Sequence, residues 1–228
     1  VECPAPVSSL TDESLPASFA KVCAAQNISS PSSVQKQCWP AILYGANVLG
    51  IAPTGSGKTL AYCMPMIPHI EAQILEQQKV HSKKKIPANS RIISPMALVL
   101  VPTRELALQV VSVLKPFKRQ MGINSGAVYG GLDKNDQLQK LKAAYGEGES
   151  LHVLVATPGR LEDFLYTASA GNSLQLEVSR VTYLVIDEAD RMLTMGFMDQ
   201  LNAISACIRP DRQTVLFSAT FPGRLREA

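Results

Sequence analysis

The sequence predicts an α/β domain in which helices cover both faces of a parallel β-sheet. Short apolar runs rich in β-branched residues recur along the chain, and continuous runs of this kind are typical of strands that are buried on both faces. Helix-like stretches separate these runs, and this alternation is typical of βαβ units. A chain of 228 residues can bury one substantial core, so we expect residues 1–228 to form a single domain.

Taken in order, each element follows from this alternation. The expected strands are 47–51, 97–101, 152–156, 181–186 and 214–217. The expected helices are 15–26, 34–43, 58–75, 104–120, 133–145, 160–168 and 197–208. Residues 76–95 hold three consecutive lysines and two prolines with little periodicity, which predicts a mobile surface loop. The lysine run favours a solvated surface, with RNA contact as the alternative.

Polar or glycine-rich segments follow the expected strands. They read Pro-Thr-Gly-Ser-Gly-Lys, Pro-Thr-Arg-Glu, Thr-Pro-Gly-Arg and Asp-Glu-Ala-Asp, and the last strand ends in Ser-Ala-Thr. Parallel strands end at the same edge of a sheet, and ligands bind there. The sequence therefore predicts one functional edge.

Composition excludes few functions. The net charge of +3 does not by itself identify a nucleic-acid binder. No apolar run approaches the ~20 residues that span a bilayer, and no signal pattern opens the chain, so we expect no membrane contact. The five cysteines are scattered, which predicts free thiols in an intracellular compartment, nuclear or cytoplasmic. The histidines are isolated, so we expect none of them to be a metal ligand, and the absence of an initial Met predicts a piece of a longer chain.

One segment predicts phosphate binding, because it follows an expected strand and opens an expected helix. It matches the Walker A pattern except that alanine replaces the first glycine. Its glycines let backbone N–H groups approach phosphate oxygens, and the helix N-terminus adds partial positive charge. The lysine is expected to reach the β- and γ-phosphates, and the last threonine to hold Mg²⁺. The segment comprises Ala52, Pro53, Thr54, Gly55, Ser56, Gly57, Lys58 and Thr59.

An acidic segment ends the fourth expected strand. Asp187 at the strand tip offers Mg²⁺ a carboxylate oxygen, and Glu188 is placed to polarise an attacking water. The alternative is a helix start that Asp190 caps, with the other carboxylates solvated. A Walker loop in the same chain favours the metal site.

In this order, the segments resemble the motifs of DEAD-box RNA helicases. Asp-Glu-Ala-Asp and Ser-Ala-Thr follow the phosphate loop, and the agreement extends over residues 31–220. Pro31–Gln35 resembles the Q motif of the family, Pro102–Ala107 its motif Ia, Gly130–Gly131 its glycine doublet and Thr157–Arg160 its motif Ib.

This resemblance implies the first, RecA-like domain of an RNA helicase that uses ATP and Mg²⁺, with residues 1–46 as the Q-motif region. It places Gln35 on the adenine edge, beside Ile28. It makes Lys58, Asp187 and Glu188 catalytic and assigns the coupling of ATP to RNA to Asp190, Ser218, Ala219 and Thr220. It places RNA phosphates on Pro102, Thr103, Arg104, Gly130, Gly131, Thr157, Pro158, Gly159 and Arg160. For these RNA segments, helix capping is the alternative, and both readings can hold because a capped helix N-terminus also binds phosphate.

The chain departs from the family in the region before Gln35. Asn27 and Ile28 stand where the family has a glycine and an aromatic residue that stacks on adenine, so we expect modestly weaker base affinity. The family also carries an aromatic residue further upstream. By position this residue corresponds to Leu10, and the alternative is that Phe19, shifted along the chain, takes its place.

The second RecA-like domain of the family is absent from these residues. Because that domain supplies arginines to the ATP site, we expect the isolated chain to bind ADP or ATP weakly, to hydrolyse ATP poorly and not to unwind RNA. We also expect it to be a monomer. Two other functions remain open at this point. One is a DNA helicase or translocase, which Asp-Glu-Ala-Asp argues against. The other is an RNA clamp in which hydrolysis is incidental, which the intact catalytic residues argue against.

Overall fold

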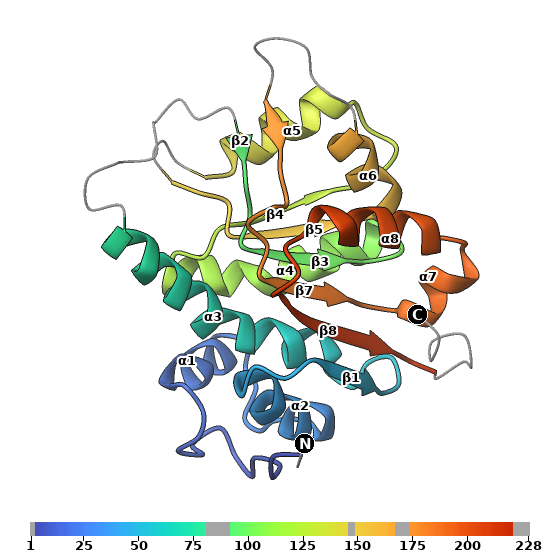
Figure 1. The fold of residues 1–228 in the computed structure, drawn as a ribbon. Helices are drawn as coiled ribbons and strands as arrows, with labels where there is room; N and C mark the ends of the chain where they lie inside the picture. Colours follow the sequence, from blue (N-terminus) through green and yellow to red (C-terminus); the bar gives the residue numbers. More distant parts are fainter. Residues whose placement is uncertain (1–2, 81–91, 146–148, 167–173, 221–228) are drawn as a thin grey trace.

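A six-stranded, wholly parallel sheet forms the centre of the computed structural model, which describes residues 3–80, 92–145, 149–166 and 174–220 (Figure 1). The strand order is β1-β8-β7-β3-β5-β4, and a short parallel pair, β2-β6, lies apart from it. The strands are β1 (Val48–Ile51), β2 (Ile92–Ile93), β3 (Ala97–Leu100), β4 (Ser125–Val128), β5 (Val153–Ala156), β6 (Gln175–Leu176), β7 (Tyr183–Ile186) and β8 (Gln213–Ser218).

Helices cover both faces of this sheet. One face packs against α1–α4 and the other against α5–α8, and neighbouring residues of one strand serve different faces. Val99 of β3, for example, joins the first core, whereas Leu98 and Leu100 join the second. The predicted α/β fold with a parallel sheet is therefore confirmed. The helices are α1 (Ala17–Ala25), α2 (Ser33–Leu43), α3 (Lys58–Val80), α4 (Arg104–Met121), α5 (Lys134–Ala143), α6 (Pro158–Tyr166), α7 (Ala189–Thr194) and α8 (Met198–Cys207).

The predicted loop over 76–95 is wrong at both of its ends. Helix α3 continues to Val80, because Glu76 and Lys79 are good helix formers, and residues 92–93 form β2. Residues 81–91, which include the lysine run, lie outside the described part of the chain. Strand β4 and helix α7 were not predicted. Strand β4 reads Ser-Gly-Ala-Val with half-buried positions, and α7 has too few residues to show a helical period.

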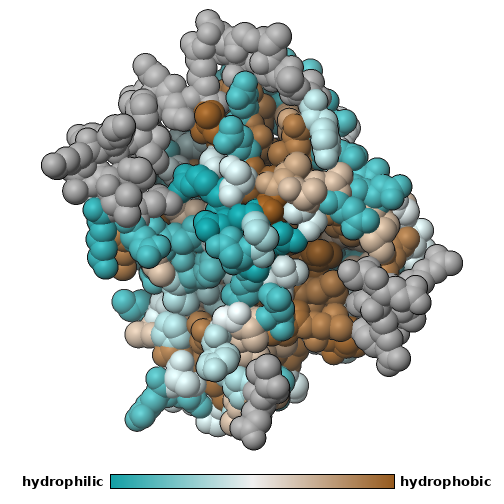
Figure 2. All heavy atoms as spheres, viewed as in Figure 1, coloured by the Kyte–Doolittle hydropathy of each residue, from teal (hydrophilic) through white to brown (hydrophobic). Residues whose placement is uncertain are grey.

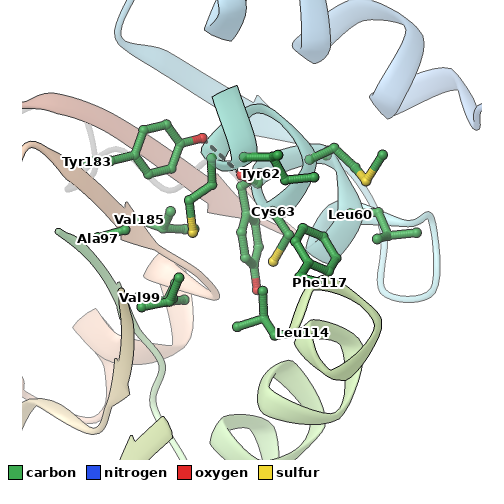
Figure 3. Close-up of a cluster of buried hydrophobic side chains, with 14 of the residues drawn as sticks. Leu60, Tyr62, Cys63, Ala97, Val99, Leu114, Phe117, Tyr183 and Val185 are labelled. Carbon is green, nitrogen blue, oxygen red and sulfur yellow. Dashed lines mark hydrogen bonds between the residues drawn. The ribbon is translucent and has the colours of Figure 1, made fainter. Parts of the chain in front are cut away.

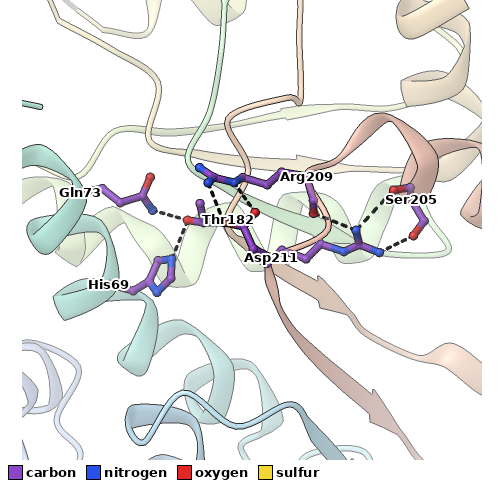
Figure 4. Close-up of polar contacts among 7 residues, drawn as sticks. His69, Gln73, Thr182, Ser205, Arg209 and Asp211 are labelled. Atoms are coloured by element: carbon purple, nitrogen blue, oxygen red, sulfur yellow. Dashed lines mark hydrogen bonds and ion pairs between the residues drawn. The ribbon is translucent and has the colours of Figure 1, made fainter. Parts of the chain in front are cut away.

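Hydrogen bonds at the amino edge of the sheet connect α3 to β7. Thr182 lies directly before β7, and its hydroxyl bonds the Nε2 atom of His69 at 2.7 Å and accepts a hydrogen bond from Gln73 (Figure 4). Burial lowers the pKa of His69, so the ring is a neutral partner in this contact. These bonds hold the middle of α3 at the amino edge, and its first turn lies at the opposite edge, next to β1.

Part of the second face carries exposed apolar side chains. Leu49 and Ile51 of β1 are each 45% exposed, and Figure 2 shows apolar atoms gathered over the region of β1 and β8. Helix α8 packs over the middle of the sheet and does not reach this end among the described residues.

Gly50 marks a close approach between β1 and β8. It pairs with Phe217 in the sheet, and a Cβ atom built on Gly50 would lie 2.3 Å from the Phe217 ring. Because that ring is fully buried, we expect Gly50→Ala to lower the free energy of unfolding by about 1–3 kcal/mol. Urea unfolding measures this loss. Gly159→Ala is the control, since nothing lies within 4 Å of its Cβ position, and equal stability of the two variants would contradict the packing argument.

Candidate nucleotide- and RNA-binding site

The phosphate loop connects β1 to α3 at the carboxyl edge of the sheet. Gly55 and Gly57 have φ values of 81° and 92°, which glycine adopts without strain. The Ser56 hydroxyl is buried without a hydrogen-bond partner among the described residues, and α3 begins at Lys58, where the N–H groups of a first helical turn have no acceptor within the helix. These features fit a bound phosphate group. Ala52 is buried, Pro53 and Thr54 are exposed, and Thr59 is half-buried in the first turn of α3.

Lys58 crosses the loop. Its side chain is 8% exposed, and Nζ donates to the carbonyl oxygen of Ala52 at 2.8 Å. A buried ammonium group needs such an acceptor, because water is largely excluded from it. An ammonium group has three N–H donors, so Nζ can keep this carbonyl and also donate to phosphate oxygens, which are strong acceptors.

Gln35 joins α2 to the phosphate loop. Its Oε1 atom accepts from the backbone N–H of Ser32 at 2.9 Å, and Nε2 donates to the carbonyl oxygen of Gly57 at 3.1 Å. A Cβ atom on Gly57 would lie 2.6 Å from Nε2, so glycine is required at this contact. The amide is 4% exposed, and it ties the start of α2 to the loop.

The residues before Gln35 explain the departures from the family pattern. Asn27 has φ of 56°, a left-handed conformation that Asn tolerates, so it suits a position where the family has glycine. Ile28 is half-buried against the core, as is Leu10. Phe19 is fully buried, edge-on to Trp39 with ring centroids 5.1 Å apart. The Phe19 ring is therefore part of the core, enclosed by apolar side chains.

Asp187 follows β7 and is 3% exposed. Its Oδ2 atom accepts from the Tyr62 hydroxyl at 2.9 Å, and Oδ1 accepts from the backbone N–H of Glu188 at 2.9 Å. Burial raises the pKa of this carboxyl, although both hydrogen bonds and the charge of Lys58 act to lower it. Tyr62 was not among the residues predicted from the sequence. A signal was present, since a polar-tipped residue stands one helical turn after Thr59 in an apolar stretch.

Glu188 adopts a left-handed conformation, with φ of 53°, at the start of α7. For a non-glycine residue this conformation carries strain, and such strain is concentrated at functional sites. The carboxylate of Glu188 pairs with Arg191 at 3.1 Å, one turn along α7. The chain therefore turns sharply between Asp187 and Glu188. As a result, the Asp187 carboxylate faces Tyr62 in the core and the Glu188 carboxylate faces Arg191.

Asp190 connects α7 to the end of β8. Its Oδ2 atom accepts from the backbone N–H and the hydroxyl of Thr220, at 3.0 and 2.7 Å, while its own N–H donates to the Ser218 hydroxyl at 3.3 Å. The carbonyl of the fully buried Ser218 accepts from the backbone N–H of Ala52 at 3.1 Å. Hydrogen bonds thus run from the phosphate loop through Ser218 to Asp190. Ala219 is exposed between its two neighbours.

The predicted RNA-contacting segments follow β3, β4 and β5, which are neighbours at the other end of the same edge. Thr103 caps α4 by accepting from the backbone N–H of Leu106, so the capping alternative holds for this residue. The exposed Arg104 stacks over the Tyr129 ring at 5.0 Å. Arg160 donates to the carbonyl oxygen of Leu132 at 2.8 Å, which connects α6 to the residue that follows the glycine doublet.

The remaining members of this group differ in exposure. Gly130 and Gly131 are exposed after β4, and Gly131 has φ of 87°. Pro102 is buried in the turn after β3 and Pro158 is buried at the start of α6, whereas Thr157 and Gly159 are half-buried. The segments after β3, β5 and β4, with their arginine side chains, therefore occupy one half of the edge. The phosphate loop and the carboxylates occupy the other half, after β1, β8 and β7.

No group of three or more His, Cys, Asp or Glu side chains gathers in the described part of the chain. One carboxylate and one hydroxyl, Asp187 and Thr59, are the candidates to hold Mg²⁺. This donor set fits the ion, which keeps several waters and shares nucleotide phosphates instead of requiring a protein cage. All five cysteines are free thiols, and none of the described helices is long and apolar enough to span a bilayer.

The fold and this edge define a P-loop nucleotide-binding domain of the RecA-like type. The chain belongs to the DEAD/DEAH box helicase family, whose model matches residues 32–228. It is 42% identical over 224 residues to the pre-mRNA-processing ATP-dependent RNA helicase PRP5 of Mycosarcoma maydis, covering 98% of this chain and 18% of that protein. It is 44% identical over 223 residues to the ATP-dependent RNA helicase DBP2 of Gibberella zeae, covering 98% of this chain and 36% of that protein.

The contacts of Asp190 predict a pH-dependent contribution to stability. Burial acts to raise the pKa of Asp190, but the hydrogen bonds from Thr220, Ser218 and Arg191 outweigh it and lower the pKa. A lowered folded-state pKa means that the stabilisation is present above the unfolded value of about 3.9 and is lost as the pH falls through the folded pKa.

We therefore expect Asp190→Ala to lower the free energy of unfolding by about 1–2 kcal/mol at pH 7. Urea unfolding of both proteins between pH 7 and about pH 3 tests this, because the difference should shrink toward the acidic end. A difference that stays constant over this range would show that the charge of Asp190 is not its source.

Proposed function

We propose that this domain is the ATP-binding half of an ATP-dependent RNA helicase. The observation that carries the proposal is the shared edge of the sheet. A phosphate loop and a buried carboxylate occupy one half of it, and backbone N–H groups with exposed arginine occupy the other. The names of the relatives, ATP-dependent RNA helicases, agree with this proposal.

On this proposal the phosphate loop binds the triphosphate through backbone N–H groups and Lys58. Thr59 and Asp187 hold Mg²⁺, which neutralises charge on the β- and γ-phosphates. Glu188 orients the attacking water and accepts its proton, which requires its carboxylate to turn from Arg191 toward the γ-phosphate. Gln35 reads the adenine edge with the donor and acceptor positions that its bonds to Ser32 and Gly57 leave free.

RNA binds the other half of the edge through its phosphates, so contacts there carry little sequence information. Selection of RNA over DNA then depends on the 2′-hydroxyl and backbone shape. The bonds from Ala52 through Ser218 to Asp190 are the proposed route by which nucleotide state reaches Thr220. In the whole protein, a second RecA-like domain completes both sites, and closure of the two domains on ATP and RNA strains a short duplex.

The nucleotide site is tested by Lys58→Ala and Glu188→Gln. Lys58→Ala should abolish ADP and ATP binding, measured by titration calorimetry on the domain. Lys118→Ala is its matched control, because Lys118 Nζ also donates to a backbone carbonyl at 2.8 Å but lies far along α4.

Glu188→Gln should keep nucleotide binding and reduce RNA-stimulated hydrolysis by at least about 100-fold, since it removes the proton acceptor. Hydrolysis is measured on the full-length protein, because we expect the isolated domain to turn over poorly. Normal turnover by this variant would remove Glu188 from the role of base. Equal stimulation by single-stranded DNA would favour a DNA translocase.

The RNA half of the edge is tested by Arg104→Ala. Loss of one phosphate contact should weaken binding of a fluorescent single-stranded RNA similarly for all sequences and reduce the salt dependence of log K by about 1. Arg209→Ala is the control, since Arg209 is also exposed but pairs with Asp211 at the opposite edge (Figure 4). If both variants bind RNA equally well, Arg104 does not contact a phosphate.

A further inference from the structure

Tyr62 is a polar-tipped residue in the centre of the core. It lies in α3, is fully buried, and its ring is packed among apolar side chains (Figure 3). The Phe217 ring lies 5.6 Å away, centroid to centroid, and the Tyr183 hydroxyl donates to the Tyr62 carbonyl at 3.0 Å. Both the ring and the backbone of Tyr62 are therefore held in place, which leaves the direction of its hydroxyl little freedom.

That hydroxyl reaches the nucleotide site. It donates to Oδ2 of Asp187 at 2.9 Å, across 125 positions of sequence. The other oxygen of Asp187 accepts from the backbone N–H of Glu188. Each carboxylate oxygen thus receives one fixed donor, and these two bonds set the rotation of the carboxylate. Since a carboxylate oxygen accepts more than one hydrogen bond, both oxygens keep capacity for a further ligand.

We propose that Tyr62 is a positioning residue for Mg²⁺, through which the Asp187 carboxylate is oriented toward the metal and its waters. The proposal rests on the proposed function, because it assumes that Asp187 serves the nucleotide-bound metal.

The position of Thr59 agrees with this role. Thr59 lies one helical turn before Tyr62 on the same face of α3. Both protein groups that are candidates to hold Mg²⁺ therefore adjoin Tyr62, Thr59 along the helix and Asp187 through a hydrogen bond.

The consequence is specific to the metal. Mg²⁺ requires nearly ideal octahedral geometry, so a carboxylate that rotates freely holds the ion and its waters poorly. Groups that orient metal-binding residues typically change metal affinity by 10–100-fold when removed. Phosphate binding by the loop backbone does not involve Tyr62, and it should persist in its absence.

The experiment measures binding of a fluorescent ADP to the 228-residue chain, once in EDTA and once over a Mg²⁺ titration. Tyr62→Phe removes one oxygen atom and keeps the ring. It should raise the Mg²⁺ concentration for half-maximal tightening at least about 10-fold and leave ADP affinity in EDTA unchanged. Thermal unfolding in the presence and absence of Mg²⁺ and ADP gives a second readout, in which the Mg²⁺-dependent rise in melting temperature should shrink.

Tyr183→Phe is the matched control. It removes an equally buried hydroxyl that bonds the Tyr62 carbonyl and does not touch Asp187. It should lower the melting temperature by a similar amount and leave the Mg²⁺ titration unchanged. Equal titrations for the two variants, shifted or unshifted, would overturn the proposal. If the unchanged chain binds no ADP in either condition, the proposed function fails and the role of Tyr62 fails with it. If ADP binds but Mg²⁺ has no effect on its affinity, only the role of Tyr62 is refuted.

Discussion

The parallel direction of the six strands is the constraint on which the rest of this structure depends. A parallel neighbour can be reached only by a crossover, and crossovers place helices on both faces of a sheet. The strands are therefore buried on both sides, and their carboxyl ends meet at one edge. Polar segments that are up to 168 positions apart, such as Ala52 and Thr220, come together there because of strand direction and not because of any attraction between them.

The order of the strands divides that edge into two halves. Strands β1, β8 and β7 lie together, and they carry the phosphate loop, the Ser218 region and the carboxylates. Strands β3, β5 and β4 carry the segments proposed to contact RNA. The hydrogen bonds that join Ala52, Ser218 and Asp190 cross between neighbouring strands and connect the phosphate loop to the start of α7, which makes them the proposed route of coupling.

Burial determines the chemistry of the first half. Asp187 and Lys58 are almost fully enclosed, and each is held by hydrogen bonds within the protein. An enclosed charge is costly unless it is paired, so both groups favour a ligand that brings the opposite charge. Phosphate offers this to Lys58, and Mg²⁺ offers it to Asp187. Tyr62 connects the core to this site. Its ring is fully buried in the core, and its hydroxyl donates to the Asp187 carboxylate and is proposed to orient it.

The sequence by itself determined the fold class, the phosphate loop and the family. Continuous apolar runs and a loop with the glycines and lysine of a Walker motif are local features, and local features can be read from order and spacing. It predicted five of the sheet strands but missed β4, whose small residues give a weak apolar signal, and it ended α3 too early. Its spacing offered Phe19 as a substitute for an upstream aromatic residue of the family, but spacing cannot reveal that this ring packs edge-on to Trp39 in the core.

Only the tertiary structure decided the contacts between distant residues. It linked Gln35 to Gly57, Asp190 to Thr220 and Tyr62 to Asp187, and these pairs are set by how helices pack across the sheet. The physical reason is that a hydrogen bond depends on position within a few tenths of an ångström, whereas sequence patterns specify only which face or edge a residue occupies. The sequence thus determined which chemical groups are present, and the packing of helices against the sheet determined the distances between them.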